Sequence, residues 1–203
     1  MKYIIIGKGG LYKIIKENLQ LHEFCGFYDD EPSDDKSYLG KISDFRYDRN
    51  FFIAIAAVRN MLLREKIIKS SLKIGGFRLN AISPFASVSV SAQLGFSNIF
   101  CPNSNIGVNV KIGNGNIVFS NSTIEHDTVI GDNVNISPGV TICGSVNIEN
   151  NVFIGAGSTI VDNISIGKNS VIGAGSLVLN DVPEGTLFYG SPGCVISKNE
   201  IYK

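Results

Sequence analysis

The stretch that decides the fold runs from residue 131 to residue 172 and reads GDNVNI SPGVTI CGSVNI ENNVFI GAGSTI VDNISI GKNSVI, with every block of six ending in isoleucine. The same phase continues on both sides, and a strict period of six is the signature of a parallel β-helix. We expect the large apolar side chain at this position to point into the interior of the solenoid. The positions are Val88, Leu94, Phe100, Ile106, Ile112, Val118, Ile124, Ile130, Ile136, Ile142, Ile148, Ile154, Ile160, Ile166, Ile172 and Val178.

Two further positions of the repeat have preferences of their own. The residue after the aliphatic is glycine at positions 95, 107, 113, 131, 155, 167 and 173. Glycine there predicts turns that need a positive φ. The residue two before the aliphatic is small or β-branched, which predicts a second inward-facing position. Its members are Val110, Thr128, Val134, Val140, Val146, Val152, Ser158, Ile164, Ser170 and Ser176.

Composition limits the classes of function. Lysine plus arginine and aspartate plus glutamate both number 18 in 203 residues, and zero net charge argues against non-specific binding of nucleic acid. The four cysteines are far apart and make no metal-binding spacing, so no metal site is predicted and a reducing cytoplasm fits. The longest apolar run, residues 51–58, is too short to cross a bilayer, and residues 3–6 are too short for a signal peptide.

The first 82 residues lack the period of six and read as a small α/β domain. The predicted elements are strands at 2–6, 24–28, 51–57 and 77–82, and helices at 11–19 and 61–72. This order predicts a small Rossmann-like parallel sheet flanked by helices. We therefore expect two domains, an α/β domain at 1–82 and an all-β parallel β-helix with a C-terminal tail at 83–203.

A glycine-rich turn, GKGG at residues 7–10, follows the first predicted strand. The dinucleotide pattern GxGxxG would need glycine where Tyr12 stands, but backbone amides at a strand-to-helix turn still favour phosphate. Asp29 follows Gly9 at the separation where a carboxylate commonly meets a ribose hydroxyl. A plain tight turn beside a solvated acidic loop explains the same residues equally well. A full dinucleotide domain needs about twice this length, so a mononucleotide-sized ligand is favoured over NAD.

The combination of glycine turn and hexad solenoid resembles the hexapeptide-repeat sugar acetyltransferases of the bacillosamine, perosamine and sialic-acid O-acetyltransferase type. The segments that carry the resemblance are GKGG at 7–10, YDD at 28–30, FFIAI at 51–55, STIEHD at 122–127, VPEG at 182–185 and GSP at 190–192. The resemblance covers the whole chain. It implies a left-handed β-helix with three hexads per coil, an α/β domain that holds the nucleotide of the sugar substrate, and a homotrimer with acetyl-CoA bound between neighbouring subunits.

His126 is the candidate catalytic base. It lies two residues after the inward-facing Ile124, so it should point outward at a coil corner, and Gly144 stacks on it one coil later. Either Glu125 or Asp127 could fix the tautomer of its ring, and a surface histidine is the alternative reading. The resemblance implies that His126 takes a proton from the acceptor amine, that Asp127 orients it, and that the Gly144 N–H stabilises the oxyanion.

The resemblance also assigns the binding residues. For the nucleotide sugar they are Gly7, Gly9, Gly10, Asp29 and Asp30, and for acetyl-CoA they are Asn135, Gly144, Gly155, Ala156 and Ala174. The last three belong to Gly-Ala-Gly triplets 18 residues apart, which stack into a track without large side chains; such residues also simply suit tight corners. The chain departs from the family at four positions, namely Leu11, Ala56, Phe119 and Asn135.

These observations predict a cytoplasmic, acetyl-CoA-dependent N-acetyltransferase that acts on the amino group of a UDP-, dTDP- or GDP-linked amino sugar. Its role would be surface polysaccharide synthesis, such as that of lipopolysaccharide O-antigen. Two alternatives stay open: an O-acetyltransferase of a sialic-acid-type sugar, and a non-catalytic β-helix binding module. We expect no metal, no nucleic-acid partner and no membrane insertion.

Overall fold

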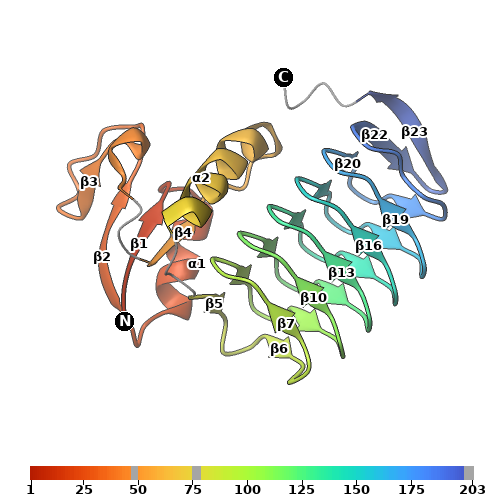
Figure 1. Ribbon diagram of the computed structural model, residues 1–203, viewed down its shortest axis with the longest axis horizontal. Helices are drawn as coiled ribbons and strands as arrows, with labels where there is room; N and C mark the ends of the chain where they lie inside the picture. The colour runs from red at the N-terminus through yellow and green to blue at the C-terminus, as the bar shows by residue number, and fades with distance from the viewer. Residues whose placement is uncertain (47–49, 75–78, 199–203) are drawn as a thin grey trace.

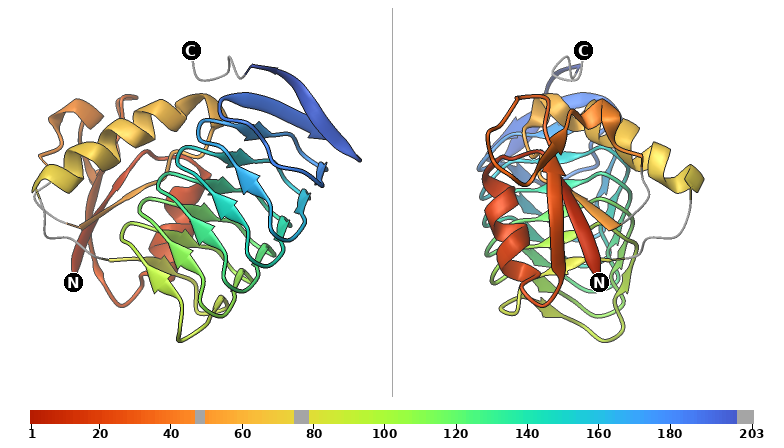
Figure 2. Two further views of the ribbon diagram at one scale, coloured as in Figure 1. Left: turned by 45° about the vertical axis from the view of Figure 1, so that its right-hand side comes forward. Right: turned by 90° about the vertical axis from the view of Figure 1, so that its left-hand side faces the viewer.

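The computed structural model of the chain describes residues 1–46, 50–74 and 79–198. An α/β region packs along one side of a three-sided solenoid, and a β-hairpin follows the last coil (Figure 1). Figure 2 shows the same arrangement from two further sides, with the α/β region in front of the coils in the right-hand view.

The α/β region contains a four-stranded parallel sheet in the order β3-β2-β1-β4. Its elements are β1 (Lys2–Ile6), α1 (Gly10–Asn18), β2 (Glu23–Tyr28), β3 (Tyr38–Gly40), β4 (Asn50–Ile53) and α2 (Met61–Ile74), with short 3₁₀ helices at Ile42–Asp44 and Val58–Asn60. The predicted small parallel sheet is confirmed. Its fourth strand is not 77–82 as expected but β3, a three-residue edge strand with too few apolar residues to be recognised.

The central strand β1 alternates its side chains between two buried layers. Tyr3 and Ile5 pack with α1, whereas Ile4 and Ile6 pack with residues of α2. This alternation is the period of two of a strand that is covered on both faces. The sheet therefore separates α1 from α2, as in other layered α/β folds.

The solenoid consists of two-residue strands, each paired in parallel with the strand 18 residues further on. The first face holds β5 (Ala81–Ile82), β8 (Ile99–Phe100), β11 (Ile117–Val118), β14 (Asn135–Ile136), β17 (Phe153–Ile154) and β20 (Val171–Ile172). The second face holds β6 (Ser87–Val88), β9 (Asn105–Ile106), β12 (Thr123–Ile124), β15 (Thr141–Ile142), β18 (Thr159–Ile160) and β21 (Leu177–Val178). The third face holds β7 (Gln93–Leu94), β10 (Lys111–Ile112), β13 (Val129–Ile130), β16 (Asn147–Ile148) and β19 (Ser165–Ile166).

Three corners join these faces. The first corner, between the first and second faces, includes residues 119–121, 155–157 and 173–175; the second corner, between the second and third faces, includes 107–109, 125–127 and 143–145. The third corner returns the chain to the first face. At the end of the solenoid, β22 (Thr186–Gly190) pairs in parallel with β20, and β23 (Gly193–Lys198) turns back antiparallel to β22.

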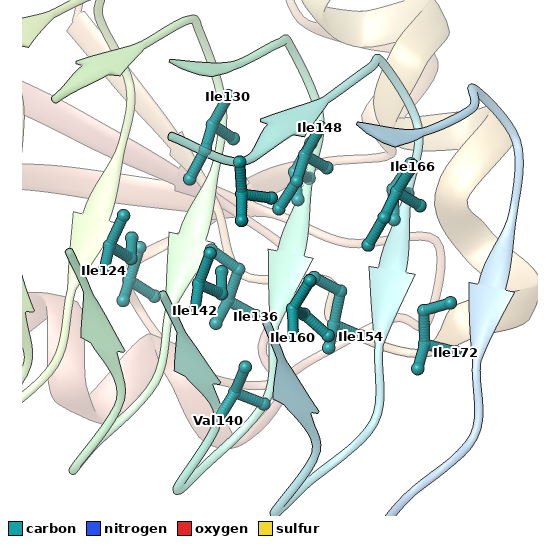
Figure 3. Packing of buried hydrophobic residues seen from close by; sticks show 14 of the residues in the cluster. Ile124, Ile130, Ile136, Val140, Ile142, Ile148, Ile154, Ile160, Ile166 and Ile172 are labelled. Carbon is teal, nitrogen blue, oxygen red and sulfur yellow. The ribbon is translucent and has the colours of Figure 1, made fainter. Parts of the chain in front are cut away.

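The interior of the solenoid is filled by the aliphatic residue of each hexad. Ile136, Ile142 and Ile154 are completely buried, and Figure 3 shows the isoleucines of successive coils stacked on one another. The second predicted inward position, represented by Val140 and Val152, is equally buried. Both predictions from the period of six are therefore confirmed.

Glycine is needed after the aliphatic residue for a different reason from the predicted positive φ. None of them has a positive φ; that conformation lies two residues further on, at Asn121, Asp127 and their equivalents, with φ near 60°. Asn, Asp and Gly tolerate this left-handed conformation best. The glycines are required instead because coils approach closely. A Cβ on Gly113 would lie 2.7 Å from the carbonyl oxygen of Gly131 in the next coil.

The α/β region covers the first face of the solenoid. Ser97 Oγ donates a hydrogen bond to Phe51 O at 2.8 Å, and Asn133 Nδ2 donates one to Met61 O at 2.8 Å. The predicted strand at 77–82 belongs to this junction: residues 77–78 lie outside the described part of the chain, and β5 pairs with β8 of the solenoid rather than with the α/β sheet. Outward-facing residues of the second and third faces remain exposed or half-exposed.

Candidate active site

His126 lies at the second corner, directly after β12, with its imidazole resting on Gly144 of the next coil. A Cβ added to Gly144 would lie 2.7 Å from Nε2 and 2.6 Å from Cε1 of His126, so only glycine leaves room for the ring. The side chain of His126 is otherwise 61% exposed. The stacking that the period of 18 predicts is therefore confirmed, and the ring is held in place while one edge stays open to solvent.

Asp127 fixes the imidazole from one side. Its backbone is left-handed, with φ 60°, and its Oδ2 lies 2.9 Å from His126 Nδ1. Asn109 Nδ2 donates to the other oxygen, Oδ1, at 3.2 Å. The hydrogen bond from His126 and then the one from Asn109 lower the pKa of the Asp127 carboxyl. Because an ionised carboxylate only accepts hydrogen bonds, Nδ1 must carry the proton, which leaves the Nε2 lone pair free to act as a base.

This geometry selects Asp127 over Glu125, a choice that the sequence leaves open. It also adds Asn109, which the sequence analysis missed. The period of 18 could have indicated it, because Asn109 lies one coil before Asp127 at the equivalent corner position, and both residues have a left-handed backbone.

Gly144 contributes its backbone as well as its lack of a side chain. Its carbonyl oxygen accepts a hydrogen bond from Asn163 N at 3.1 Å, and the neighbouring Ser145 N donates to His126 O at 2.9 Å. Within the described residues, no hydrogen-bond acceptor is paired with the Gly144 N–H. A donor beside the free Nε2 is thus available to a ligand.

The five residues expected to bind the nucleotide line one cavity of about 1010 Å³. Gly7, Gly9, Gly10, Asp29 and Asp30 form its glycine-turn and acidic walls, and the N-terminus of α1 starts at the glycine turn. Apolar residues of the segment after β4, in the α/β region, form a further part of the wall. The solenoid contributes Phe119 from the first corner. Folding therefore brings together a phosphate-favouring turn, carboxylates and apolar surface.

The two aspartates of this cavity already hold backbone groups. Asp29 Oδ2 accepts from Lys8 N at 2.7 Å and its Oδ1 accepts from Glu31 N at 2.9 Å. Asp30 Oδ1 accepts from Ile42 N at 3.2 Å. Both side chains shape the wall of the cavity, and each carboxylate oxygen keeps a further lone pair for a ligand donor.

The residues expected to bind acetyl-CoA lie in three places. Gly155, Ala156 and Ala174 stack at the first corner, where a Cβ on Gly155 would lie 2.8 Å from Ala174 Cα. Gly144 lies at the second corner, one face away. Asn135 lies on β14 of the first face, where it is 1% exposed and donates a hydrogen bond to Ser137 Oγ at 3.2 Å.

Asn135 is accordingly a correction to the sequence-based set. Its neighbours in register are Ile117 and Phe153, and the α/β region buries this face. The side chain has no exposed surface for a cofactor, so we leave it out of the site. Among the residues that the structure describes, no group of histidine, cysteine, aspartate or glutamate could hold a metal ion. None of the described helices has the length and apolar character needed to cross a membrane.

Comparison with known proteins identifies the solenoid. The family model of the bacterial transferase hexapeptide (six repeats) matches residues 109–144 and 145–180. No curated protein sequence matches the chain.

Solved structures match nearly the whole chain. PerB from Caulobacter crescentus, in complex with CoA and GDP-perosamine, is 26% identical with a TM-score of 0.86, and the match covers 97% of this chain and 98% of that one. The acetyltransferase domain of PglB from Neisseria gonorrhoeae, in complex with acetyl coenzyme A, is 27% identical with a TM-score of 0.82 and coverages of 96% and 98%. WeeI from Acinetobacter baumannii is 25% identical with a TM-score of 0.80 and coverages of 97% and 100%.

The hexad period and the family-model match over residues 109–180 show the solenoid of the bacterial hexapeptide transferases, with the histidine at its second corner. The chain shares with PerB and with the acetyltransferase domain of PglB the whole architecture, in which an N-terminal α/β region is joined to a left-handed β-helix. The alternative of a non-catalytic β-helix module is therefore set aside.

Proposed function

We propose that this acetyltransferase moves the acetyl group of acetyl-CoA to the amino group of a nucleotide-linked amino sugar. The observation that carries the proposal is the imidazole of His126, held by Asp127 against the bare backbone of Gly144. Support comes from the fold shared with PerB, whose structure contains CoA and GDP-perosamine. The sugar product would serve surface polysaccharide synthesis, including lipopolysaccharide O-antigen, and would be made in the cytoplasm.

The chain's own groups suffice for the proton transfers. Acetyl-CoA, when bound, supplies an acetyl group activated as a thioester. His126 Nε2 accepts the proton that the attacking nitrogen sheds and returns it to the departing sulfur, so that no net proton stays on the enzyme. Asp127 keeps Nδ1 protonated and stabilises the imidazolium while it exists. The Gly144 N–H donates to the oxygen on which negative charge develops.

The first corner fits the pantetheine arm of acetyl-CoA. No side chain longer than a methyl group stands at Gly155, Ala156 and Ala174, so an extended chain can approach the backbone there. The nucleotide of the acceptor fits the cavity of the α/β region, where the glycine turn and the start of α1 favour phosphate. UDP, dTDP and GDP all contain the diphosphate that this reading requires.

The two halves of the proposed site lie at different corners. The nucleotide cavity and the small-residue track are at the first corner, whereas His126 and Gly144 are at the second. We propose a homotrimer in which the second face of each copy turns toward a common axis. This arrangement places the first corner of one copy against the second corner of its neighbour, so that the halves of one site come from two copies.

Apolar side chains at the start of the solenoid support this assembly. Phe85, at the first corner, is 74% exposed, and Val108, at the second corner, is 56% exposed, with a fully exposed Val90 one coil before it. These three residues lie in the first two coils, at the two corners that bound the second face. Contact between neighbouring copies would bring Phe85 of one copy against the stacked Val90 and Val108 of the next, into one apolar patch that is removed from water.

The experiment is an acetyl-transfer assay with the purified protein, acetyl-CoA and a panel of UDP-, dTDP- and GDP-linked amino sugars. The reaction is monitored by release of the CoA thiol and by the mass of the product. We expect one of them to gain a single acetyl group, and His126→Ala to lower kcat by about 10²–10⁴-fold. His22→Ala is the matched control, because His22 lies outside both halves of the site. Full activity of His126→Ala, or acetylation only of sialic-acid hydroxyls, contradicts the proposal.

A further inference from the structure

Lys8 is the only residue of the 7–10 turn that carries a side chain. This side chain lines the nucleotide cavity and extends toward residues 29–35, which we call the acidic loop. The loop contributes residues 29–33 to the wall of the cavity, and five of its seven residues are aspartate or glutamate. A lysine between a phosphate-favouring turn and a strongly acidic wall can serve either of them.

The contacts of Lys8 reach both ends of the acidic loop. Its backbone N–H donates to Asp29 Oδ2 at 2.7 Å, at the start of the loop. Its ammonium lies 3.0 Å from Asp35 Oδ2, at the end of the loop, and donates to Ser33 Oγ at 3.2 Å. The same ammonium lies 4.8 Å from the centre of the Phe27 ring. One residue therefore ties the whole loop to the glycine turn.

Each carboxylate that contacts Lys8 also closes a turn of the loop. Asp29 Oδ1 accepts from Glu31 N, and Asp35 Oδ1 accepts from Ser37 N, both at 2.9 Å. The hydrogen bond from Ser37 N and then the one from Lys8 lower the pKa of Asp35 to about 2. The Asp35 carboxyl consequently stays ionised, and available to the Lys8 ammonium, at any pH at which the enzyme would work.

We propose that Lys8 is a positioning residue for the nucleotide-sugar substrate: it holds the acidic loop against the glycine turn, so that the cavity wall stands ready before the ligand binds. The inference rests on the proposed function, in which this cavity holds the nucleotide. Ordering a loop at the moment of binding reduces affinity, and a wall that is already ordered avoids that cost. Lys8 also offsets the repulsion between the loop carboxylates and the diphosphate.

Direct contact of the Lys8 ammonium with the phosphates is the competing role. The ammonium already contacts Asp35, Ser33 and the Phe27 ring, and a lysine that turned to the phosphates would give up these partners. The two roles make opposite predictions for Asp35. If Lys8 positions the loop, removing the charge of Asp35 weakens nucleotide binding; if Lys8 binds phosphate, the same change frees the ammonium and strengthens it.

The test is a double-mutant cycle with Lys8→Met and Asp35→Asn in the full chain. Binding of UDP, dTDP and GDP is measured by titration calorimetry, and kcat and KM are measured with the accepted sugar nucleotide. We expect each single variant to weaken binding of the preferred nucleoside diphosphate roughly tenfold. The double variant should bind no more weakly than either single variant, because both substitutions remove the same contact between Lys8 and Asp35. The kcat and the KM for acetyl-CoA should not change.

Two further variants control the cycle. Lys8→Arg should restore most of the affinity, since it keeps the charge, and Lys13→Met makes the same substitution at an exposed site on α1 and should change nothing. Tighter binding by Asp35→Asn, or unchanged binding by Lys8→Met, overturns the inference while leaving the proposed function intact. A wild-type protein that binds none of the three diphosphates overturns both. A parallel fall in kcat and in melting temperature would show a merely structural role.

Discussion

The imidazole of His126 lies against the Cα of Gly144, so closely that a Cβ at position 144 would stand 2.7 Å from Nε2. Gly144 is not among the residues with positive φ, so alanine fits its backbone conformation. Gly144→Ala should therefore push the ring aside and lower kcat by on the order of 10²-fold, with little change in melting temperature.

The control is the same substitution in a His126→Ala background. Without the ring there is nothing for the new methyl group to displace, so adding Gly144→Ala should cause no additional loss. A Gly144→Ala single variant that keeps the wild-type kcat would show that this contact does not position the base.

Asp127→Asn tests the tautomer of the base. Asn109 holds Oδ1 of residue 127, so the amide of an asparagine would present its NH₂ group to His126 Nδ1. The proton would then move to Nε2, which removes the lone pair needed for catalysis. We expect a loss in kcat on the order of 10²-fold or more with the fold retained, because asparagine tolerates the left-handed φ at this position.

The lowered pKa of Asp127 also predicts a pH dependence. A depressed folded-state pKa contributes stability above the unfolded value of 3.8, and that contribution is lost as the pH falls below it. As the pH falls below the unfolded value of 3.8, the wild type should therefore lose more stability than Asp127→Asn, as followed by urea denaturation. Equal losses in the two proteins would mean that the carboxylate is not held by its neighbours.

The assembly is tested at Val108. Val108→Asp places a charge at the second corner, where the proposed trimer brings in Phe85 and its surroundings from the next copy. We expect light scattering to show monomers and the activity to disappear, because each site would lose one of its halves. Leu62→Asp is the matched control, since Leu62 is similarly exposed but lies on α2 over the first face. A monomeric wild type with full activity would rule out the composite site.

Ile154→Asp tests the interior of the solenoid. Ile154 is completely buried among isoleucines of neighbouring coils, and an unpaired carboxylate there should cost several kcal/mol of unfolding free energy. Asn147→Asp adds the same charge on the exposed third face and should leave the melting temperature nearly unchanged. Comparable melting of the two variants would contradict the inward position of Ile154.

Two errors of the sequence analysis show where periodicity stops being informative. The glycines after the aliphatic were assigned to turns, although the turn conformation falls at Asn, Asp, Ser and other Gly residues two positions later. The close approach between coils that does require these glycines is a contact across 18 residues, and it leaves no local trace. The edge strand β3 was missed because three residues with one leucine carry no pattern.

The sequence by itself determined that the chain forms a β-helix, because the period of six fixes which residues point inward, and three hexads per coil, as the family resemblance implies, stack residues 18 apart. That rule places His126 on Gly144 and Ala156 beneath Ala174, whatever the rest of the chain does. The tertiary structure alone decided which faces stay open. The α/β region covers the first face and buries Asn135, and it folds the 7–10 turn, the acidic loop and Phe119 into one cavity. These contacts join segments with no common period, so packing between them, and not spacing along the chain, sets the nucleotide half of the site.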